Sequence, residues 1–349
     1  MKTFVIAGEI SGDALAAQVL KKWGRQNIEG VIGPKLKALG ARELFSIEEF
    51  QVMGFRAIIK SLPHFIKLFY KIRKEILNRN PEHLLLVDNA EFSLLIAKSL
   101  RKKGFKGKIT QLVAPSVWAW RKGRIKTLEE NFDELLSILP FEKKYFENSP
   151  LSVEYIGHPL IEELSQLQIP NRLNLGTKPI ISLFPGSRKN EILTNLPLQL
   201  KAASTLTSHQ VAIGIASEKF RPLIKSLGGN ALLISPEDRF ELMSKSQFAL
   251  SKLGTINLEL AYFGVPTITS FAIPKFEQFI LQYLFKIFLP HYSLVNMLAE
   301  RRLFPEYIGS FATLENLTRE VKNFSTNKEL RDWVIAGCAQ VKKTLETQK

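Results

Sequence analysis

Two successive series of short apolar runs are the feature that most constrains the fold of this 349-residue chain. The first series comprises residues 4–7, 84–87, 109–113, 135–139 and 153–156, and the second comprises 180–184, 211–215, 232–234, 248–250 and 267–269. The segments between these runs are long enough for crossover helices, which is the pattern of buried parallel strands. The sequence therefore predicts an α/β protein that repeats one parallel-sheet architecture twice.

A polar stretch at residues 162–178, containing Pro170 and Gly176, separates the two series and is typical of a linker. We therefore expect an N-terminal Rossmann-like domain at 1–165, a C-terminal Rossmann-like domain at 166–325 and a helical segment at 326–349. Open parallel sheets bind ligands beyond the carboxyl ends of their strands. Two such sheets that face one another would form a central cleft.

The formal net charge of +15 favours partners that carry phosphate. The charge is concentrated at 67–79, 101–108 and 121–126, without a Cys/His finger or an RNA-recognition motif. We predict an anionic membrane or a phosphorylated substrate as partner, and no nucleic acid. The single cysteine, Cys338, favours a reducing compartment, and charged residues and Pro274 interrupt the apolar stretch at 271–290. We expect a cytoplasmic protein whose membrane contact is peripheral.

Candidate chemistry in the first series follows two of the predicted strands. After the first strand, Gly8–Asp13 is either a tight turn with a helix cap, from Ser11 or Asp13, or a ligand-binding turn. After the second, Asp88 is our leading candidate for a general base, with an Asx-turn as the alternative. Glu9 and His158 are the rival bases.

A second candidate element is the segment 115–121, which combines two indole rings with basic residues. Ser116, Trp118 and Arg121 suit contacts with a sugar and a phosphate. A packed loop is the alternative interpretation, because paired tryptophans most often belong to a core.

The second series contains two turns suited to a nucleotide diphosphate. Gly186, Ser187 and Arg188 follow one strand, where small residues let the backbone approach phosphate and Arg188 can pair with it. Gly254 and Thr255 follow another strand. Glu259, one helical turn after Thr255, suits a ribose hydroxyl, and a capped helix with a surface glutamate is the alternative.

Metal and covalent mechanisms have little support in the sequence. The five histidines and five aspartates are scattered without a D-x-D pair, and no G-x-S-x-G elbow occurs. We predict no metal and no cofactor. Residues 52–76 combine aromatic, aliphatic and basic side chains at helical spacing, and 276–288 is a second apolar patch. The first segment is equally well interpreted as a membrane-surface helix or as a helix that packs within a domain.

Several ordered motifs together resemble the lipid-A-disaccharide synthase family. They are AGEISGD at 7–13, VMGF at 52–55, PSVWAWR at 115–121, LPFE at 139–142, IGH at 156–158, PGSR at 185–188, Gly254-Thr255 with Glu259, and NMLA at 296–299. The resemblance covers nearly the whole chain, and PSVWAWR is its most specific element. The fold that it implies is of the glycosyltransferase B type, with two Rossmann-like domains facing a central cleft.

The resemblance also implies a reaction and its partners. It implies transfer of 2,3-diacylglucosamine from its UDP derivative to 2,3-diacylglucosamine 1-phosphate at the cytoplasmic membrane, by an inverting enzyme that forms a β-1,6-linked disaccharide phosphate and UDP. By this resemblance Asp88 is an important acidic residue, Arg188 lies in the nucleotide-binding signature and Asn296 lies in a motif near UDP. We also predict that Ser11 and Gly12 bind substrate. A homodimer is a further prediction. The alternatives are another UDP-sugar transferase or epimerase of this fold, and a non-catalytic scaffold that binds membrane or phosphate.

Overall fold

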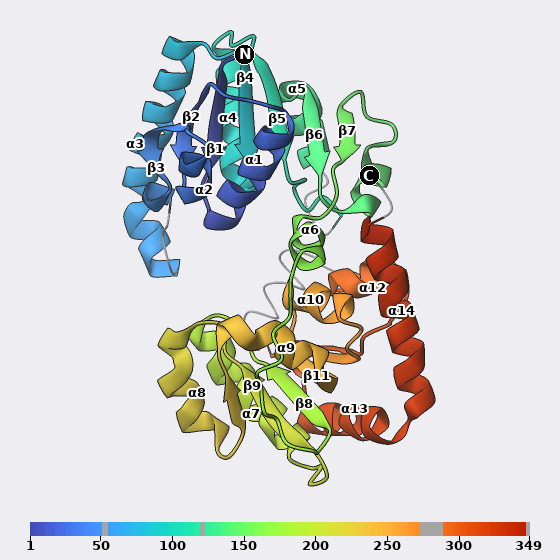
Figure 1. Ribbon diagram of the computed structural model, residues 1–349. Coiled ribbons are helices and arrows are strands. Elements are labelled where there is room, and N and C mark those ends of the chain that lie inside the picture. Colours follow the sequence, from blue (N-terminus) through green and yellow to red (C-terminus); the bar gives the residue numbers. More distant parts are fainter. Residues whose placement is uncertain (51–54, 119–122, 273–288, 347–349) are drawn as a thin grey trace. The chain divides into compact units, whose positions relative to one another are not determined.

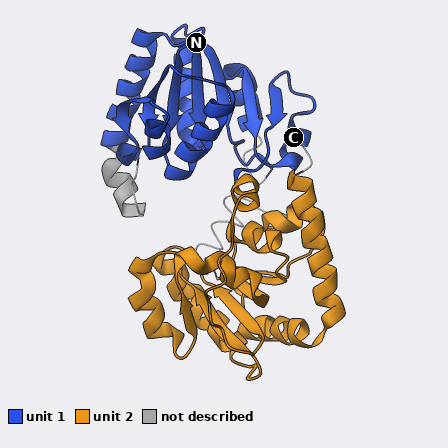
Figure 2. Cartoon of the chain, in the orientation of Figure 1, with its two compact units in different colours: residues 1–159, 348–349 blue, residues 160–347 orange. Residues whose placement is uncertain are grey.

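The computed structural model describes residues 1–50, 55–118, 123–272 and 289–346, with 55–62 described as helical backbone (Figure 1). These residues form two compact units, of which the first ends at Pro159 and the second begins at Leu160 (Figure 2). The sequence predicts this boundary at residue 165. The structure instead places helix α6 (Pro159–Ser165) with the second unit, because Leu160, Ile161 and Leu164 are buried in the core of that unit.

The first unit contains a parallel sheet in the order β3-β2-β1-β4-β5-β6-β7. Its strands are β1 (Thr3–Ala7), β2 (Ile28–Ile32), β3 (Arg42–Ser46), β4 (His83–Val87), β5 (Lys108–Leu112), β6 (Glu134–Ser137) and β7 (Ser152–Tyr155). Its helices are α1 (Ile10–Lys22), α2 (Pro34–Ala38), α3 (Phe55–Arg79), α4 (Ala90–Lys102) and α5 (Arg124–Asn131), with 3-10 turns at Ile47–Phe50 and Pro140–Phe146.

Residues of the inner strands enter two separate cores, one on each face of this sheet. Val5 and Ala7 of β1 pack with α1 and α2, whereas Phe4 and Ile6 pack with α3, α4 and α5. Because successive strand residues point to opposite faces, a strand buried on both faces is apolar throughout. This explains why the strands of the first series appear in the sequence as continuous apolar runs.

The second unit repeats the arrangement with the order β10-β9-β8-β11-β12-β13. Its strands are β8 (Ile180–Phe184), β9 (Gln210–Gly214), β10 (Leu232–Ile234), β11 (Ser246–Lys252), β12 (Thr267–Phe271) and β13 (Glu306–Ile308). Its helices are α6, α7 (Lys189–Ala203), α8 (Arg221–Gly228), α9 (Arg239–Ser244), α10 (Ile256–Tyr262), α12 (Leu294–Ala299), α13 (Leu314–Thr326) and α14 (Lys328–Glu346). Short 3-10 turns lie at Glu218–Phe220, Pro236–Asp238 and Gly309–Phe311.

Numbered within each unit, both sheets contain the order 3-2-1-4-5-6 of a doubly wound Rossmann-type fold. The strand order therefore reverses between β1 and β4 in the first unit, and between β8 and β11 in the second. Ligands of such sheets bind outside the carboxyl ends of the strands at this reversal. The predicted segment 326–349 falls largely on α14, whose Val334, Cys338 and Val341 are buried in the core of the second unit.

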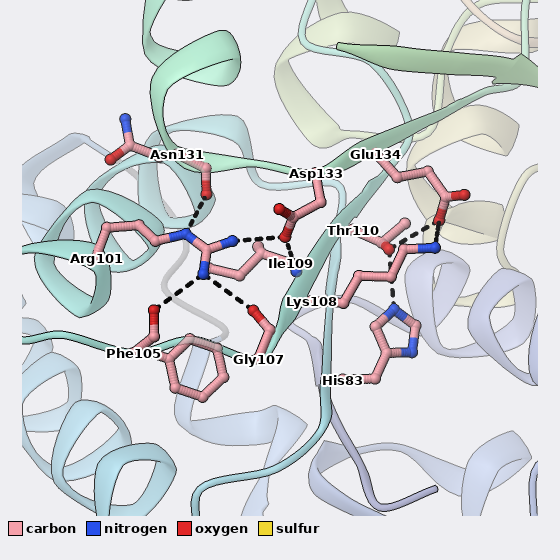
Figure 3. Close-up of polar contacts among 10 residues, drawn as sticks. All are labelled: His83, Arg101, Phe105, Gly107, Lys108, Ile109, Thr110, Asn131, Asp133 and Glu134. Carbon is pink, nitrogen blue, oxygen red and sulfur yellow. Dashed lines mark hydrogen bonds and ion pairs between the residues drawn. The ribbon is translucent and has the colours of Figure 1, made fainter.

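Arg101 is one of the basic residues from which we predicted a positive face at 101–108, and it is bound within its own unit (Figure 3). Its guanidinium donates to the carbonyls of Asn131, Phe105 and Gly107 over 3.0–3.2 Å, and to the carboxylate of Asp133 at 2.5 Å. The side chain therefore links the end of α4 to β5 and β6. Its main role is structural.

Lys108 is a second basic residue of that stretch whose charge is neutralised internally (Figure 3). Its ammonium lies 3.0 Å from Glu134, which also accepts a hydrogen bond from Thr110. His83 contacts the same Thr110 hydroxyl, and burial lowers the pKa of His83 to about 4, so that the ring is neutral at pH 7. The predicted positive face at 101–108 is thus reduced to the exposed lysines between Arg101 and Lys108.

Candidate functional site

The strand reversal of the second unit carries a pocket of about 410 Å³. Six of the seven residues that we predicted for a nucleotide line it: Gly186, Ser187, Arg188, Gly254, Thr255 and Glu259. They come from two segments far apart in the sequence: the loop after β8, and the loop after β11 with the following helix α10, which holds Glu259. β8 and β11 are neighbouring strands. The sheet topology therefore brings together the two turns that the sequence suggested independently.

Glu191 is a pocket residue that the sequence analysis did not single out. Its carboxylate accepts a hydrogen bond from the Ser187 N–H at 3.0 Å, and it lies 3.1 Å from the Lys252 ammonium and 3.5 Å from the Arg188 guanidinium. Burial alone would raise the pKa of Glu191, but the bonds from Ser187 and Lys252 hold it below its ordinary value. Its position in the first turn of α7, directly after the glycine turn, is the signal that could have identified it.

Gly186 is required at its position for two reasons. Its φ is +131°, a conformation that other residues rarely adopt. A Cβ at this residue would also lie 2.6 Å from the Glu191 side chain. The glycine therefore makes room for a carboxylate of the same chain.

The other carboxylate in the lining, Glu259, faces Arg239 across 3.4 Å. Burial raises the pKa of Glu259, and the Arg239 charge opposes this shift. The Arg239 guanidinium also lies 3.8 Å above the ring centre of Phe240. Arg239 was missed because nothing in its local sequence distinguishes it. It reaches the pocket only because α9 follows β10 at the same edge of the sheet.

The structure does not bring Asn296, the seventh predicted residue, into this lining. Its side chain is fully buried and makes two hydrogen bonds of 2.8 Å with the backbone N–H and carbonyl of Phe304. Its own N–H is bound by Ser293, which caps α12. These contacts give Asn296 a role in joining α12 to the following loop.

In the first unit, the turn after β1 divides its predicted residues between surface and core. Glu9 and Ser11 are exposed at the start of α1, whereas Gly12 is buried, and a Cβ there would lie 3.2 Å from Val87 of β4. Glu9 occupies the cap position without a side-chain capping bond. Gly12 therefore serves close packing of α1 on the sheet, and Glu9 and Ser11 are accessible to a ligand.

Asp13 does not cap α1, contrary to one of our expectations. It is fully buried, and its carboxylate accepts hydrogen bonds from the backbone N–H groups of Gly33, Lys35 and Leu36. These groups lie at the start of α2, a helix whose own cap residue is the glycine. A carboxylate compensates such unpaired N–H groups well. Asp13 is therefore a structural cap between two helices.

At the other side of this reversal, Asp88 ends β4 in a left-handed conformation with φ of +51°. Its side chain is exposed and has no hydrogen-bond or ion-pair partner among the described residues. The alternative role of a local turn belongs instead to Asn89, whose side chain accepts the N–H of Phe92 and caps α4. The Asp88 carboxylate is thus available for contact with a substrate.

The buried side-chain amide of Gln111 holds the backbone around Asp88 in place. Gln111 of β5 donates to the carbonyls of Asp88, Leu112 and Val113 over 3.1–3.2 Å, and the Ser93 hydroxyl also donates to the Asp88 carbonyl. Val113 has a φ of +73°, which is strained for a branched residue. Paired carbonyls help to hold these unusual conformations at the carboxyl edge of the sheet.

The tryptophan motif and the LPFE motif are joined through a buried carboxyl group. The Trp118 indole N–H donates to Glu142 at 3.3 Å, and its ring contacts Phe141 edge-on at 5.7 Å. Glu142 also accepts hydrogen bonds from the Ser137 hydroxyl and the Leu139 N–H, and burial raises its pKa to about 7. A hydrogen bond and a ring contact thus hold the Trp118 side chain against the LPFE motif.

The remaining predicted residues of the first unit differ in accessibility. Ser116 is half-buried beside this anchored tryptophan. His158 is 8% exposed, and burial lowers its pKa to about 4, so its ring is neutral at pH 7. Arg121 lies outside the described residues, as do the patch at 276–288 and residues 52–54 of the VMGF motif.

The described part of α3 uses one face for the core and leaves the other exposed. Leu68, Ile72 and Ile76 are buried in the first unit, as expected for a helix that packs within a domain. The exposed side chains include two large apolar residues and three lysines: Ile66, Tyr70, Lys67, Lys71 and Lys74. No helix among the described residues is long and apolar enough to cross a membrane.

Comparisons with known proteins agree with this architecture. The family model described as lipid-A-disaccharide synthetase matches residues 3–348. The fold also occurs in the UDP-GlcNAc 2-epimerase from Neisseria meningitidis bound to UDP-GlcNAc, with 13% identity, a TM-score of 0.60 and coverage of 99% of this chain and 97% of that chain. The calicheamicin glycosyltransferase CalG4 has 13% identity, a TM-score of 0.57 and coverage of 99% and 95%. At this identity the likeness shows the fold alone.

Relatives of higher identity carry the name lipid-A-disaccharide synthase. The one from Chlamydia muridarum is 42% identical over 88% of this chain, which corresponds to 53% of the relative. The chain thus spans about half the length of the chlamydial relatives that it matches. The relative from Solibacter usitatus is 30% identical over 99% of this chain and 93% of its own length. The chain belongs to the lipid-A-disaccharide synthetase family.

Proposed function

We propose that the chain is an inverting glycosyltransferase that makes the lipid A disaccharide. It transfers 2,3-diacylglucosamine from UDP-2,3-diacylglucosamine to 2,3-diacylglucosamine 1-phosphate and releases UDP. Family membership supports the reaction. The observation that carries the proposal is the cationic pocket at the strand reversal of the second unit, because it presents three cationic side chains where such a fold binds a nucleotide.

In this proposal the second unit holds the UDP moiety of the donor. Arg188 and Lys252 contact the diphosphate together with the backbone N–H groups around Ser187 and Gly254. Glu259 accepts hydrogen bonds from the ribose hydroxyls. As the bond between the anomeric carbon and the diphosphate breaks, these donors stabilise the negative charge that develops on UDP.

Asp88 is the proposed general base in the first unit. Its carboxylate accepts the proton of the acceptor 6-hydroxyl while that oxygen attacks the anomeric carbon from the face opposite UDP. Its exposed side chain, which has no partner in the part of the chain that the structure describes, supports this choice. Of its rivals, Glu9 is equally exposed, whereas His158 is buried. Ser11, Ser116, Trp118 and Arg121 remain proposed contacts of the acylated sugars.

A groove along α4 supports a location for the acceptor within the first unit. It has a volume of about 450 Å³ and is lined by Glu91, Leu94, Leu95, Lys98, Gly123, Arg124 and Thr127. The α4 residues of this lining recur at helical spacing on one face, beginning three residues after Asp88. Its leucines suit an acyl chain and Lys98 suits the 1-phosphate, whereas Arg124 is largely buried and bound to Glu91.

The exposed face of α3 supports peripheral contact with the inner leaflet of the cytoplasmic membrane. Lysines beside Tyr70 and Ile66 combine attraction to anionic headgroups with apolar groups that can enter the interface. Both substrates carry acyl chains, so an enzyme that acts on them must work at such a surface. Assembly as a homodimer stays a prediction.

The test supplies both acylated sugars in detergent to the purified chain and follows UDP and the disaccharide phosphate. Formation of both products in equal amounts, with an anomeric configuration opposite to that of the donor, is the expected result. Conversion of UDP-GlcNAc to its 2-epimer without acceptor would instead indicate an epimerase, a function for which the shared fold leaves room. Folded protein that forms neither product from intact substrates would refute the assignment.

A further inference from the structure

The contacts of Glu191 coincide with the groups that the proposed function assigns to the diphosphate. One carboxylate takes the Ser187 N–H at 3.0 Å, the Lys252 ammonium at 3.1 Å and the Arg188 guanidinium at 3.5 Å. Carboxylate and phosphate oxygens accept the same charge-assisted hydrogen bonds. The Glu191 side chain is also confined, because it and its partner Lys252 are only 12% and 21% exposed. The Arg188 side chain, in contrast, is 83% exposed.

The pocket lining contains both cationic and anionic side chains, and both affect the binding of an anionic ligand. Arg188, Arg239 and Lys252 are cationic, and Glu191 and Glu259 are anionic. Arg239 is paired with Glu259, which leaves Glu191 as the counter-ion shared by the other two cations. A diphosphate that binds these two cations therefore meets a negative charge already in contact with them.

We propose that Glu191 is an internal competitor of the diphosphate, which weakens the binding of UDP and thereby favours its release after transfer. This inference rests on the proposed function, because it takes the pocket of the second unit as the UDP site. Glu191 would hold Lys252 and the Ser187 loop in place and yield part of their hydrogen bonding when the diphosphate binds. This competition also depends on Gly186, because only a residue without a Cβ leaves space for the Glu191 carboxylate.

The test is the variant Glu191→Gln, which keeps the size of the side chain and an oxygen that can accept from Ser187 but removes the charge. Calorimetry should show UDP binding that is about three- to tenfold tighter than in the wild type, with a smaller gain at high salt. Uridine, which lacks phosphates, should bind both proteins equally. Glu191→Ala should shift UDP affinity in the same direction, provided that thermal unfolding shows it to be folded.

A matched control is Glu315→Gln, which removes an exposed carboxylate from the first turn of another helix of this unit, α13. It should leave UDP affinity unchanged. Unchanged or weaker UDP binding in folded Glu191→Gln, with normal uridine binding, would overturn the inference and show that Glu191 only organises the donors. If the wild-type chain binds neither UDP nor uridine, the proposed function itself fails.

Discussion

Two consecutive residues at the end of β4 divide a structural and a chemical role between them. Asn89 adopts the left-handed conformation and caps α4 with its side chain, whereas Asp88, also left-handed, leaves its carboxylate exposed. Asparagine and aspartate tolerate this conformation better than most residues. The local fold therefore places an exposed carboxylate at the strand reversal of the first unit.

The variant Asp88→Asn tests this division at the residue level. Asparagine suits the backbone conformation, so the fold should persist, while loss of the base should lower turnover by about 10²–10⁴-fold. The dissociation constant of UDP should change by less than about twofold, because UDP is assigned to the other unit. Steady-state kinetics and calorimetry measure the two effects. Asp332→Asn, at an exposed position of α14, is the control, and near-normal turnover of Asp88→Asn would dismiss it as the base.

Glu142 gives a second prediction at the residue level, through the pH dependence of stability. Burial raises its pKa from 4.5 to about 7, so the folded protein binds this proton more tightly than the unfolded chain does. Stability should therefore fall as pH rises from about 4.5 through 7, by up to about 3 kcal/mol, and this contribution should become constant above about pH 8. Urea unfolding from pH 5 to 8 should show a flatter profile for Glu142→Gln. Glu147→Gln, an exposed neighbour, should retain the slope of the wild type.

At the level of elements, α3 serves two environments at once. Its buried stripe is already committed to the core of the first unit, so only the exposed face can contact a membrane. Replacing Lys67, Lys71 and Lys74 by glutamine should weaken binding to vesicles that contain phosphatidylglycerol by about 10²-fold, at about 1 kcal/mol for each lysine near the surface.

Vesicle sedimentation at low and high salt measures this effect of α3. The control removes three exposed lysines from the second unit, Lys225, Lys322 and Lys328, and has the same net charge as the α3 variant. Equal loss of binding in both triple variants would show that net charge alone attracts the chain to membranes, and would argue against a specific role for α3.

Elements also show how far the sequence alone could predict the fold. The continuous apolar runs located ten strands, with β8 and β10 matched at both ends. Three strands of the described residues were missed, for physical reasons that differ. β2 contains Glu29 and Gly30, β3 is a half-exposed edge strand with charged residues, and β13 is only three residues long. Periodicity identifies a strand through its burial, so edge strands and polar strands escape it.

The candidate site was predictable only where a motif is local. Turns such as 185–188 and 254–255 could be recognised because small residues follow an apolar strand. The pairings across the sheet could not, since Glu191 meets Lys252 and Trp118 meets Glu142 only after the strands have assembled. Asn296 shows a further limit, because nothing in its motif reveals that its side chain holds the backbone of Phe304.

At the level of the whole molecule, the chain contains the same strand order twice, but the charged side chains at the two strand reversals differ. The first reversal presents the carboxylates of Asp88 and Glu9, and the second presents the cations Arg188, Lys252 and Arg239. Such a division suits a transfer reaction in which one unit activates a hydroxyl group and the other accepts the charge of a leaving diphosphate. One architecture thus supplies two complementary chemistries.

This division predicts that protein cations, without a divalent metal, neutralise the leaving group. Turnover in EDTA should therefore lie within about twofold of turnover in Mg²⁺. The variant Lys252→Gln should lower turnover by about 10²-fold in either condition, because it loses a preorganised positive charge at the diphosphate. Initial rates of UDP release measure both effects, with Lys225→Gln, an exposed lysine of α8, as the control. Activity that disappears in EDTA and returns with Mg²⁺ would instead show that a metal ion shares the charge of the diphosphate with Arg188 and Lys252.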